Sequence, residues 1–261
     1  MTPPRSALGA PPQRGTAGGP AQPDPRRLLG NTRRAPAARG GAYALYGSRN
    51  SGSAMVEAAL ELAKAPYRIV SAATWDKKSA LAELKRVNPL QQIPTLVTPD
   101  GTVISESAAI LIHLGLVHPR AHLLPTAAGE RAKALRAMVF IATNCYSAVG
   151  IIDYPQRWLG KSDPQANDRL RAGARRRLHK MWSTFADTFV GERQSSSFLF
   201  GERIGAADLM AAVVSRWSGA RKHLAKHRPA LAALVERVEA HPVVAPVIAR
   251  HWGAGLVSTG A

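Results

Sequence analysis

The sequence contains a single cysteine, Cys145, among its 261 residues. One cysteine excludes intrachain disulfides, cysteine-based zinc sites and CxxC redox pairs. No uninterrupted run of about 18 apolar residues occurs, which argues against a membrane-spanning helix. The N-terminus is rich in Pro, Gly, Ala and Arg and lacks the apolar segment of a secretory signal. These absences predict a soluble, cytoplasmic protein without a membrane partner.

The histidines do not provide a metal site in place of the missing cysteines. His223 and His227 have the HxxxH spacing of a helical ligand pair, but they lie among Lys222, Lys226 and Arg228. Those cations repel a divalent ion, and no carboxylate lies nearby in the sequence to complete the shell. We therefore expect no metal site.

Acidic residues are also scarce, 17 against 35 lysines and arginines, and the formal net charge is +18. Residues 1–41 contribute +6 of this charge, and a dense basic stretch occupies residues 169–180. Such a charge attracts nucleic acids and anionic surfaces. No aromatic residue is interleaved with the basic stretch, so a solvated helix face is favoured over nucleic-acid binding.

The order of local patterns divides the chain into three parts. Residues 1–41 have no hydrophobic periodicity and are predicted to be disordered, although a true start near Tyr43 is an alternative. Residues 42–119 form the second part. We expect strands at 42–46 and 67–70, helices at 53–64, 77–87 and 106–116, and a hairpin of strands at 94–98 and 102–105. This βαβαββα order is that of a thioredoxin-like α/β domain.

Residues 126–261 show helical patterns and no strand pattern. We expect helices at 128–151, 164–190, 206–217 and 229–240, and hence an all-α C-terminal domain. Asp163 followed by Pro164 is a typical helix start, because the carboxylate caps free N–H groups and proline fits the first turn.

Two motifs resemble those of the cytosolic glutathione S-transferase family. They are Asn-Pro-Leu-Gln-Gln-Ile-Pro-Thr-Leu at 88–96 and Ile-Ser-Glu-Ser-Ala-Ala-Ile at 104–110. The resemblance extends from Ala42 to about Trp252, and its serine-containing loop is similar to those of bacterial, theta-, zeta- and beta-like members. It implies glutathione as co-substrate without a metal, a homodimer, and conjugation of glutathione to a small hydrophobic electrophile in detoxification. Gly205 and Asp208 resemble the family's capping box, with Gly in place of Ser or Thr.

The resemblance assigns part of the glutathione site to the segment before the hairpin. Pro94 is predicted to follow a cis peptide bond, which X-Pro bonds tolerate best. This geometry would leave the backbone of Ile93 free to pair with the cysteinyl unit of glutathione. Gln92 would reach the glycyl end. A trans proline that begins an edge strand is the alternative interpretation.

The second part of the implied site lies where the hairpin leads into the next helix. Ser107 and the backbone of Glu106 would hold the γ-glutamyl carboxylate, because a helix N-terminus favours an anion. The Glu106 side chain would face the γ-glutamyl ammonium group. Simple helix capping by Ser105 is the alternative.

The catalytic hydroxyl is expected in the loop after the first strand. The resemblance favours Ser51, whose hydrogen bond to the glutathione sulfur would lower the thiol pKa from about 8.5. Ser48 and Ser53 are competitors, and Tyr46 is less favoured because it belongs to the strand. The Ser-Ser-Cys loop of maleylacetoacetate isomerases is here Ser51-Gly52-Ser53, which argues against that activity.

The acceptor pocket is expected between the two domains. The candidates for its lining are Asn144, Cys145, Tyr146, Met138, Tyr154 and Trp217, although core packing explains each of them equally well. Cys145 itself is interpreted as a small buried apolar residue. Besides conjugation, the alternatives are a glutathione-dependent isomerase and a non-catalytic binding or regulatory protein.

Overall fold

The structure is a computed structural model, and it describes residues 41–253 apart from 74, 77, 160–162 and 191–195. Of the tail that the sequence predicts to be disordered, residues 1–40 lie outside the described residues. The disorder of the tail and the alternative start near Tyr43 therefore stay predictions.

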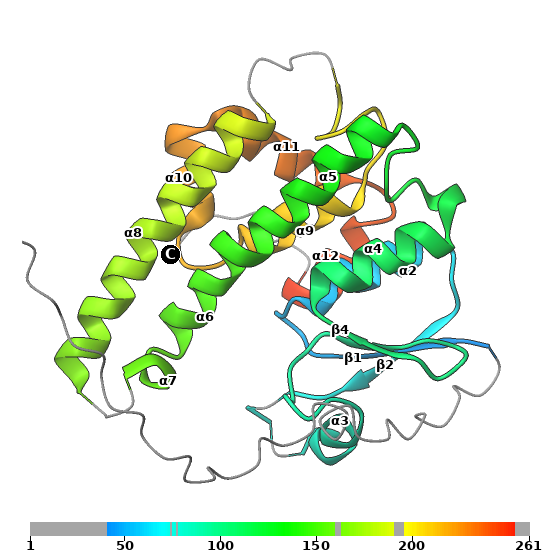
Figure 1. Cartoon of the computed structure of the whole chain (residues 1–261), viewed down its shortest axis with the longest axis horizontal. Helices are drawn as coiled ribbons and strands as arrows, with labels where there is room; N and C mark the ends of the chain where they lie inside the picture. The colour runs from blue at the N-terminus through cyan, green and yellow to red at the C-terminus, as the bar shows by residue number, and fades with distance from the viewer. Residues whose placement is uncertain (1–40, 74, 77, 160–162, 191–195, 254–261) are drawn as a thin grey trace, which may run out of the picture. The chain divides into compact units, whose positions relative to one another are not determined.

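A four-stranded mixed sheet forms the first part of the described chain (Figure 1). Its strands are β1 (Tyr43–Gly47), β2 (Tyr67–Ser71), β3 (Thr95–Val97) and β4 (Val103–Ser105), in the order β2-β1-β3-β4. β1 is parallel to β2 and antiparallel to β3, and β3 is antiparallel to β4. The predicted βαβ unit and the predicted hairpin are therefore confirmed.

Helices cover both faces of this sheet, namely α2 (Ser53–Leu62), α3 (Leu81–Val87) and α4 (Ser107–Val117). Alternate residues of β1 point to opposite faces, as strand geometry requires. Tyr43 and Leu45 join the apolar core that contains α2 and α4, whereas Ala44 and Tyr46 join a smaller core with Leu84 of α3. In Figure 1, α3 lies on one side of the sheet and α2 and α4 lie on the other.

Helix α3 begins later than predicted, at Leu81 instead of residue 77. The Ser79 hydroxyl donates to the backbone carbonyls of Ala73 at 2.9 Å and Asp76 at 2.6 Å. Such bonds between a side chain and the nearby backbone compete with helix formation, so the chain turns here before the helix starts.

The remaining described residues form helices and loops, with one isolated bridge between Phe198 and Gly201. The helical prediction for this part is confirmed. The elements are η1 (Pro119–Ala121), α5 (Ala128–Phe140), η2 (Ile141–Tyr146), α6 (Ser147–Asp153), α7 (Gln156–Leu159), α8 (Pro164–Phe189), α9 (Ala206–Val214), α10 (Ala220–His227), α11 (Pro229–Ala240) and α12 (Ala245–Trp252).

Several boundaries in the helical part differ from the prediction. The sequence patterns missed α7, α10 and α12, and α9 ends at Val214 instead of residue 217. Ser218 and Gly219 then adopt the left-handed conformation, with φ of 57° and 77°. Left-handed residues end helices, so the chain breaks between α9 and α10.

The predicted helix 128–151 is continuous but contains a wider turn. Its middle segment, η2, is a π-helix between α5 and α6. By length and composition alone, Ala128–Asp153 is apolar enough to span a membrane, with a mean hydropathy of 1.5. In the structure its buried residues, such as Met138 and Ile141, belong to the same core as α8 and α9, as in a core helix of a globular fold.

One apolar core runs from the sheet through α2 and α4 into α9. At the start of α9 the predicted capping box is present, because Asp208 accepts hydrogen bonds from the backbone N–H groups of Gly205 and Leu199, both at 2.8 Å. Burial raises the pKa of Asp208 to about 6, although these bonds oppose the rise. The motif fixes the core helix against which the first part of the chain packs.

Candidate functional site

A cavity of about 590 Å³ opens between the loops of the sheet and the segment η2–α6. Every site residue predicted from the sequence lines it, namely Ser51, Gln92, Ile93, Pro94, Glu106 and Ser107. They come from three separate loops: the one between β1 and α2, the one before β3, and the junction of β4 and α4. The fold therefore brings residues that are distant in sequence to one wall.

The backbone of this wall is strained at three points. Asn50, Gln91 and Glu106 have φ values of 56°, 54° and 66°, and all three line the cavity. A non-glycine residue rarely adopts such values, and the cost is tolerated mainly where a functional geometry requires it. Three of the six described non-glycine residues with positive φ therefore lie on this wall, and the other three, Lys64, His122 and Ser218, do not line the cavity.

The peptide bond between Ile93 and Pro94 is cis, as predicted. Among the described residues, no hydrogen bond uses the backbone N–H or C=O of Ile93. β3 begins only at Thr95, so the sheet leaves these two groups unpaired at the cavity. A donor and an acceptor side by side suit the backbone of a bound peptide.

The start of α4 presents a second set of unpaired groups. Ser107 is buried, and no hydrogen bond of its hydroxyl occurs among the described residues. Capping by Ser105, the alternative interpretation, is not made, because Glu106 is the N-cap residue of α4 and no side-chain cap bond forms there. Free N–H groups and the helix dipole therefore face the cavity, where they favour an anion.

The structure distinguishes among the three candidate hydroxyls of the serine loop. Only Ser51 lines the cavity; Ser48 and Ser53 do not. The Ser51 hydroxyl donates to the carbonyl of Ser48 at 2.7 Å and accepts from the backbone N–H of Ser53 at 3.2 Å. The Ser53 hydroxyl also donates to the Ser48 carbonyl, at 3.1 Å, so that carbonyl keeps a donor when Ser51 turns away.

Tyr46, the least favoured candidate, points elsewhere. Its hydroxyl donates to Glu83 of α3 at 2.5 Å, on the face of the sheet away from α2 and α4. Burial and this bond raise the pKa of Tyr46 to about 12. The tyrosine does not line the cavity.

The opposite wall of the cavity is partly as predicted. Tyr146, Tyr154 and Trp217 line it, whereas Asn144, Cys145 and Met138 do not. Met138 and Cys145 are fully buried in the core, and burial raises the pKa of the Cys145 thiol to about 12. The expected role of the three in the acceptor pocket is therefore wrong, and the interpretation of Cys145 as a buried apolar residue is confirmed. Helical geometry turns neighbours of Tyr146 to other faces.

Sequence reasoning missed several residues that line the cavity. Arg157 lies over the Tyr154 ring, 4.0 Å from its centroid, and both line the cavity. Trp75 and Leu90 also line it, with 60% and 67% of their surfaces exposed. Large apolar residues in otherwise polar loops were the available signal.

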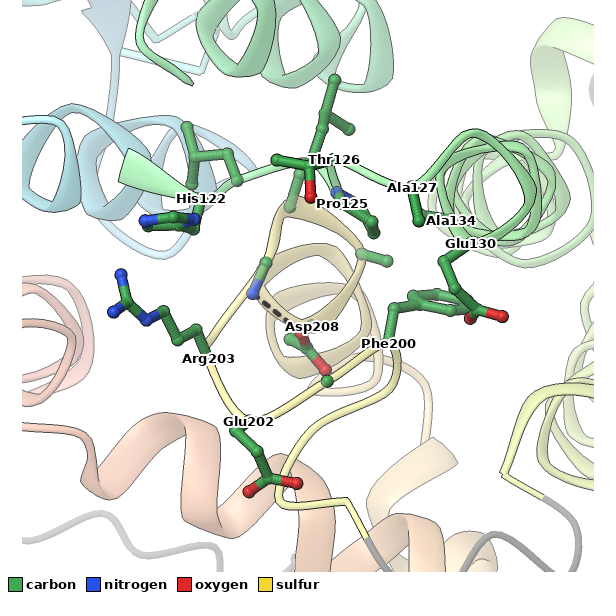
Figure 2. A pocket seen from close by; sticks show the side chains of 16 residues that line it. His122, Pro125, Thr126, Ala127, Glu130, Ala134, Phe200, Glu202, Arg203 and Asp208 are labelled. Carbon is green, nitrogen blue, oxygen red and sulfur yellow. Dashed lines mark hydrogen bonds between the residues drawn. The ribbon is translucent and has the colours of Figure 1, made fainter. Parts of the chain in front are cut away.

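A second cavity, of about 280 Å³, lies beside the start of α9 (Figure 2). Polar and charged side chains surround it, among them His122, Glu130, Glu202 and Arg203. Asp208 at its centre is bonded to the backbone of Gly205, as the dashed line in Figure 2 shows. Since this carboxylate already caps the helix, the larger cavity is the better candidate site.

Within the described ranges, no three His, Cys, Asp or Glu side chains are grouped so that they could hold a metal ion. The His223 ring stacks on that of His179, with a centroid distance of 4.7 Å, and is tilted by 37° against that of His227, at 4.8 Å. His223 Nε2 is 2.8 Å from the Ser183 hydroxyl. Stacked rings present their faces to one another instead of converging their nitrogens on one point.

Comparison with protein families gives two matches. Residues 53–116 match the model described as the N-terminal domain of glutathione S-transferase, and residues 156–251 match the model of its C-terminal domain. Together these matches span more than half of the chain, one on each side of the cavity.

Similar proteins lead to the same family. The chain is 27% identical over 209 residues to the uncharacterized GST-like protein YncG of Escherichia coli K12, covering 79% of this chain and 97% of the relative. It is 34% identical over 101 residues to a probable maleylacetoacetate isomerase of Caenorhabditis elegans, covering 39% of this chain and 45% of the relative. A solved glutathione S-transferase of Methylobacterium radiotolerans, in complex with glutathione sulfonate, is 28% identical. Its TM-score is 0.63, with 79% of this chain and 94% of that chain covered.

Proposed function

Since this chain belongs to the glutathione S-transferase family, we propose that it binds glutathione in the 590 Å³ cavity. The protein then joins the thiolate of glutathione to a small hydrophobic electrophile. The observation that carries the proposal is the single wall on which the six predicted residues meet. That wall offers unpaired backbone groups, an unpaired hydroxyl and a helix N-terminus, which match the donors and acceptors of an extended peptide.

The proposed orientation of glutathione follows from the charges along the wall. Ser107 and the N-terminus of α4 hold the γ-glutamyl carboxylate, and the exposed Glu106 carboxylate faces the ammonium group. The N–H and C=O of Ile93, beside Pro94, pair with the cysteinyl backbone. Gln92 lies toward the glycyl end, and Ser51 lies at the sulfur.

The reaction needs activation of the thiol and close approach of the electrophile. A hydrogen bond from Ser51 stabilises the thiolate, and the thiol proton leaves to solvent before the attack. The sulfur electron pair then forms the carbon–sulfur bond, and the displaced electron pair stays with the leaving group or the adjoining atom of the electrophile. Holding both reactants in one cavity supplies the proximity.

The electrophile is proposed to lie against the aromatic rings that the helical part of the chain contributes to the cavity. The rings of Tyr146 and Trp217 stack at 5.5 Å with an angle of 12°, which gives a flat apolar surface beside the cavity. Flat, apolar acceptors fit such a surface best.

A glutathione-dependent isomerase is the second candidate function. It is favoured by the 34% identity with the maleylacetoacetate isomerase over 101 residues. The glycine at position 52 of the serine loop departs from the Ser-Ser-Cys pattern of those enzymes, so conjugation remains the first proposal. A non-catalytic glutathione-binding protein is the third.

Two assays on the full chain test the proposal in order. We expect retention on glutathione-agarose with elution by free glutathione, followed by glutathione-dependent loss of an aromatic electrophile without added metal. Isomerisation of maleylacetoacetate without such loss would favour the second candidate. Retention without turnover of either substrate class would favour the third, and failure of retention would contradict glutathione binding.

The proposal includes a cytoplasmic homodimer, as in the resemblance from which it derives, and no role in binding nucleic acid. Sedimentation at micromolar concentration checks the dimer, and a species of one chain only would contradict it. A shift of duplex DNA in a gel at physiological salt would contradict the expectation about nucleic acid.

A further inference from the structure

The hydroxyl of Tyr146 lies against the backbone of Gly52, the residue that follows Ser51. A Cβ atom added to Gly52 would overlap the Tyr146 hydroxyl oxygen and lie 3.2 Å from Cζ of the ring. A side chain at position 52 and the tyrosine at position 146 therefore exclude each other. The glycine of the serine loop makes room for a side chain that comes from the helical part of the chain.

The tyrosine is held in this position from two sides. It is the last residue of the π-helix η2, and such π-turns occur frequently at functional sites. Its ring stacks on Trp217, which follows α9. Since backbone and ring are both fixed, the hydroxyl is presented to the cavity in one place.

The phenol proton of Tyr146 is not used within the described part of the chain. No hydrogen bond among the described residues uses the Tyr146 O–H as donor. Burial raises the pKa of Tyr146 to about 12, with smaller contributions from Glu106 and Asp153, so the phenol stays protonated at neutral pH.

We propose that Tyr146 donates a hydrogen bond to the glutathione sulfur, as a second donor beside Ser51. This inference rests on the proposed function, because it assigns a residue to the sulfur end of that same site. The sulfur then lies between a hydroxyl of the serine loop and a hydroxyl of η2. Activation of the thiol depends on both parts of the chain. Gly52 is required because a side chain at this position would keep the Tyr146 hydroxyl away from the sulfur beside Ser51.

The test measures the thiol pKa of bound glutathione in the full chain by ultraviolet absorbance of the thiolate. In Tyr146→Phe we expect this pKa to rise by about one unit, a tenfold smaller thiolate fraction near neutral pH, because a charge-assisted bond is lost. The dissociation constant of glutathione should change by less than about twofold, since the sulfur makes few of the contacts. The matched control is Tyr154→Phe, in the same cavity, which should leave the thiol pKa unchanged.

A second variant tests the contact with the loop. Gly52→Ala should displace the Tyr146 hydroxyl and raise the thiol pKa by a similar amount. In the Tyr146→Phe background the same alanine should add little, because the group it displaces is gone. Additive effects of the two changes would contradict the contact as the cause.

The two proposals fail in different ways. If the unchanged protein does not bind glutathione, the proposed function and this inference fall together. If it binds glutathione and Tyr146→Phe leaves the thiol pKa where it was, only this inference falls. Equal effects of Tyr146→Phe and Tyr154→Phe would also overturn it, because the change would then reflect the general polarity of the cavity.

Discussion

The contact between α2 and α12 and the wall of the cavity use polar groups in opposite ways. In the contact, the buried Glu57 carboxylate accepts hydrogen bonds from His251 at 2.9 Å and Arg250 at 2.8 Å. On the cavity wall, the Ser107 hydroxyl and the Ile93 backbone have no partner among the described residues. The Glu57 carboxylate is thus occupied by protein partners, although Nδ1 of His251 in the same contact has none, whereas the groups at the open cavity are available to a ligand. The first region should therefore affect stability and the second should affect binding.

The largest expected effect is on stability, from Glu57→Gln. The Glu57 carboxylate is buried but Arg250 is about half-exposed, so removing the charge should lower the free energy of unfolding by about 2 kcal/mol, less than in a fully buried pair. Urea denaturation at neutral pH measures the loss, and glutathione binding by the folded variant should stay unchanged. The control is Glu61→Gln, one turn away on α2, whose pair with Arg250 is half-exposed and should contribute less than about 1 kcal/mol.

The same pair predicts a dependence on pH. Burial alone would raise the pKa of Glu57, but the bonds from His251 and Arg250 bring it below the ordinary value of 4.5. A lowered pKa means that the stabilisation is present above pH 4.5 and is lost as the pH falls through the folded value. The difference between the unchanged protein and Glu57→Gln should therefore shrink in acid, and a constant difference would contradict the ion pair.

The next effect is on binding, from Ser107→Ala. A bond to a carboxylate contributes about 1.5–3 kcal/mol, so the dissociation constant of glutathione should rise tenfold or more. Calorimetric titration measures it, while the midpoint of unfolding should hardly move because the hydroxyl has no partner among the described residues. Ser105→Ala, two residues earlier and outside the cavity, is the control. If Ser107→Ala lowers stability and leaves the affinity for glutathione unchanged, the assignment of the cavity wall to binding is wrong.

Ser51→Ala should have a smaller effect, on chemistry instead of binding. The thiol pKa of bound glutathione should rise by about half to one unit, and conjugation should slow at neutral pH and recover partly at high pH. Affinity should stay within about twofold. Ser48→Ala is the control, because Ser48 does not line the cavity. If Ser48→Ala raises the thiol pKa and Ser51→Ala does not, the register of the loop is wrong.

The smallest effect is expected at His223, outside both regions. Burial lowers its pKa, and the neighbouring His179, His227 and Arg228 lower it further. The folded protein therefore binds this proton less readily than the unfolded chain, and stability falls as the pH drops below about 6.5. In His223→Gln this acid-induced loss should be smaller by about 0.5 kcal/mol or less, measured as the urea midpoint between about pH 7.5 and 5.5. A steeper loss in the variant would contradict the sign.

The sequence predicted the elements best where local chemistry decides them. The order of the strands, the hairpin, the cis bond before Pro94 and the capping by Asp208 are confirmed. The start of α3 was wrong because Ser79 bonds to the preceding backbone. The helices α10 and α12 were missed because each is eight residues long, too short for a clear periodicity.

The predictions of site residues also succeeded where a local motif indicated them and failed where packing decided. The resemblance of the motifs before β3 and at the start of α4 to those of the family indicated five of the six predicted site residues that line the cavity. Among the serines of the loop, the sequence left the choice open, and the structure shows only Ser51 at the cavity. For Asn144, Cys145 and Met138 the sequence could not separate cavity lining from core packing, because the buried face of the segment 128–153 depends on how it packs against α8 and α9.

The sequence by itself determined the family motifs, the two kinds of secondary structure and the glycine in the serine loop, since these depend on neighbouring residues and on periods of about two and 3.6. Only the tertiary structure decided which side chain lies against that glycine. It brings Tyr146 of η2 against Gly52 of the first loop, and it pairs Glu57 of α2 with His251 of α12. Such meetings depend on how helices pack on the sheet through a shared core, and no local pattern along the chain encodes the distance between two side chains that far apart.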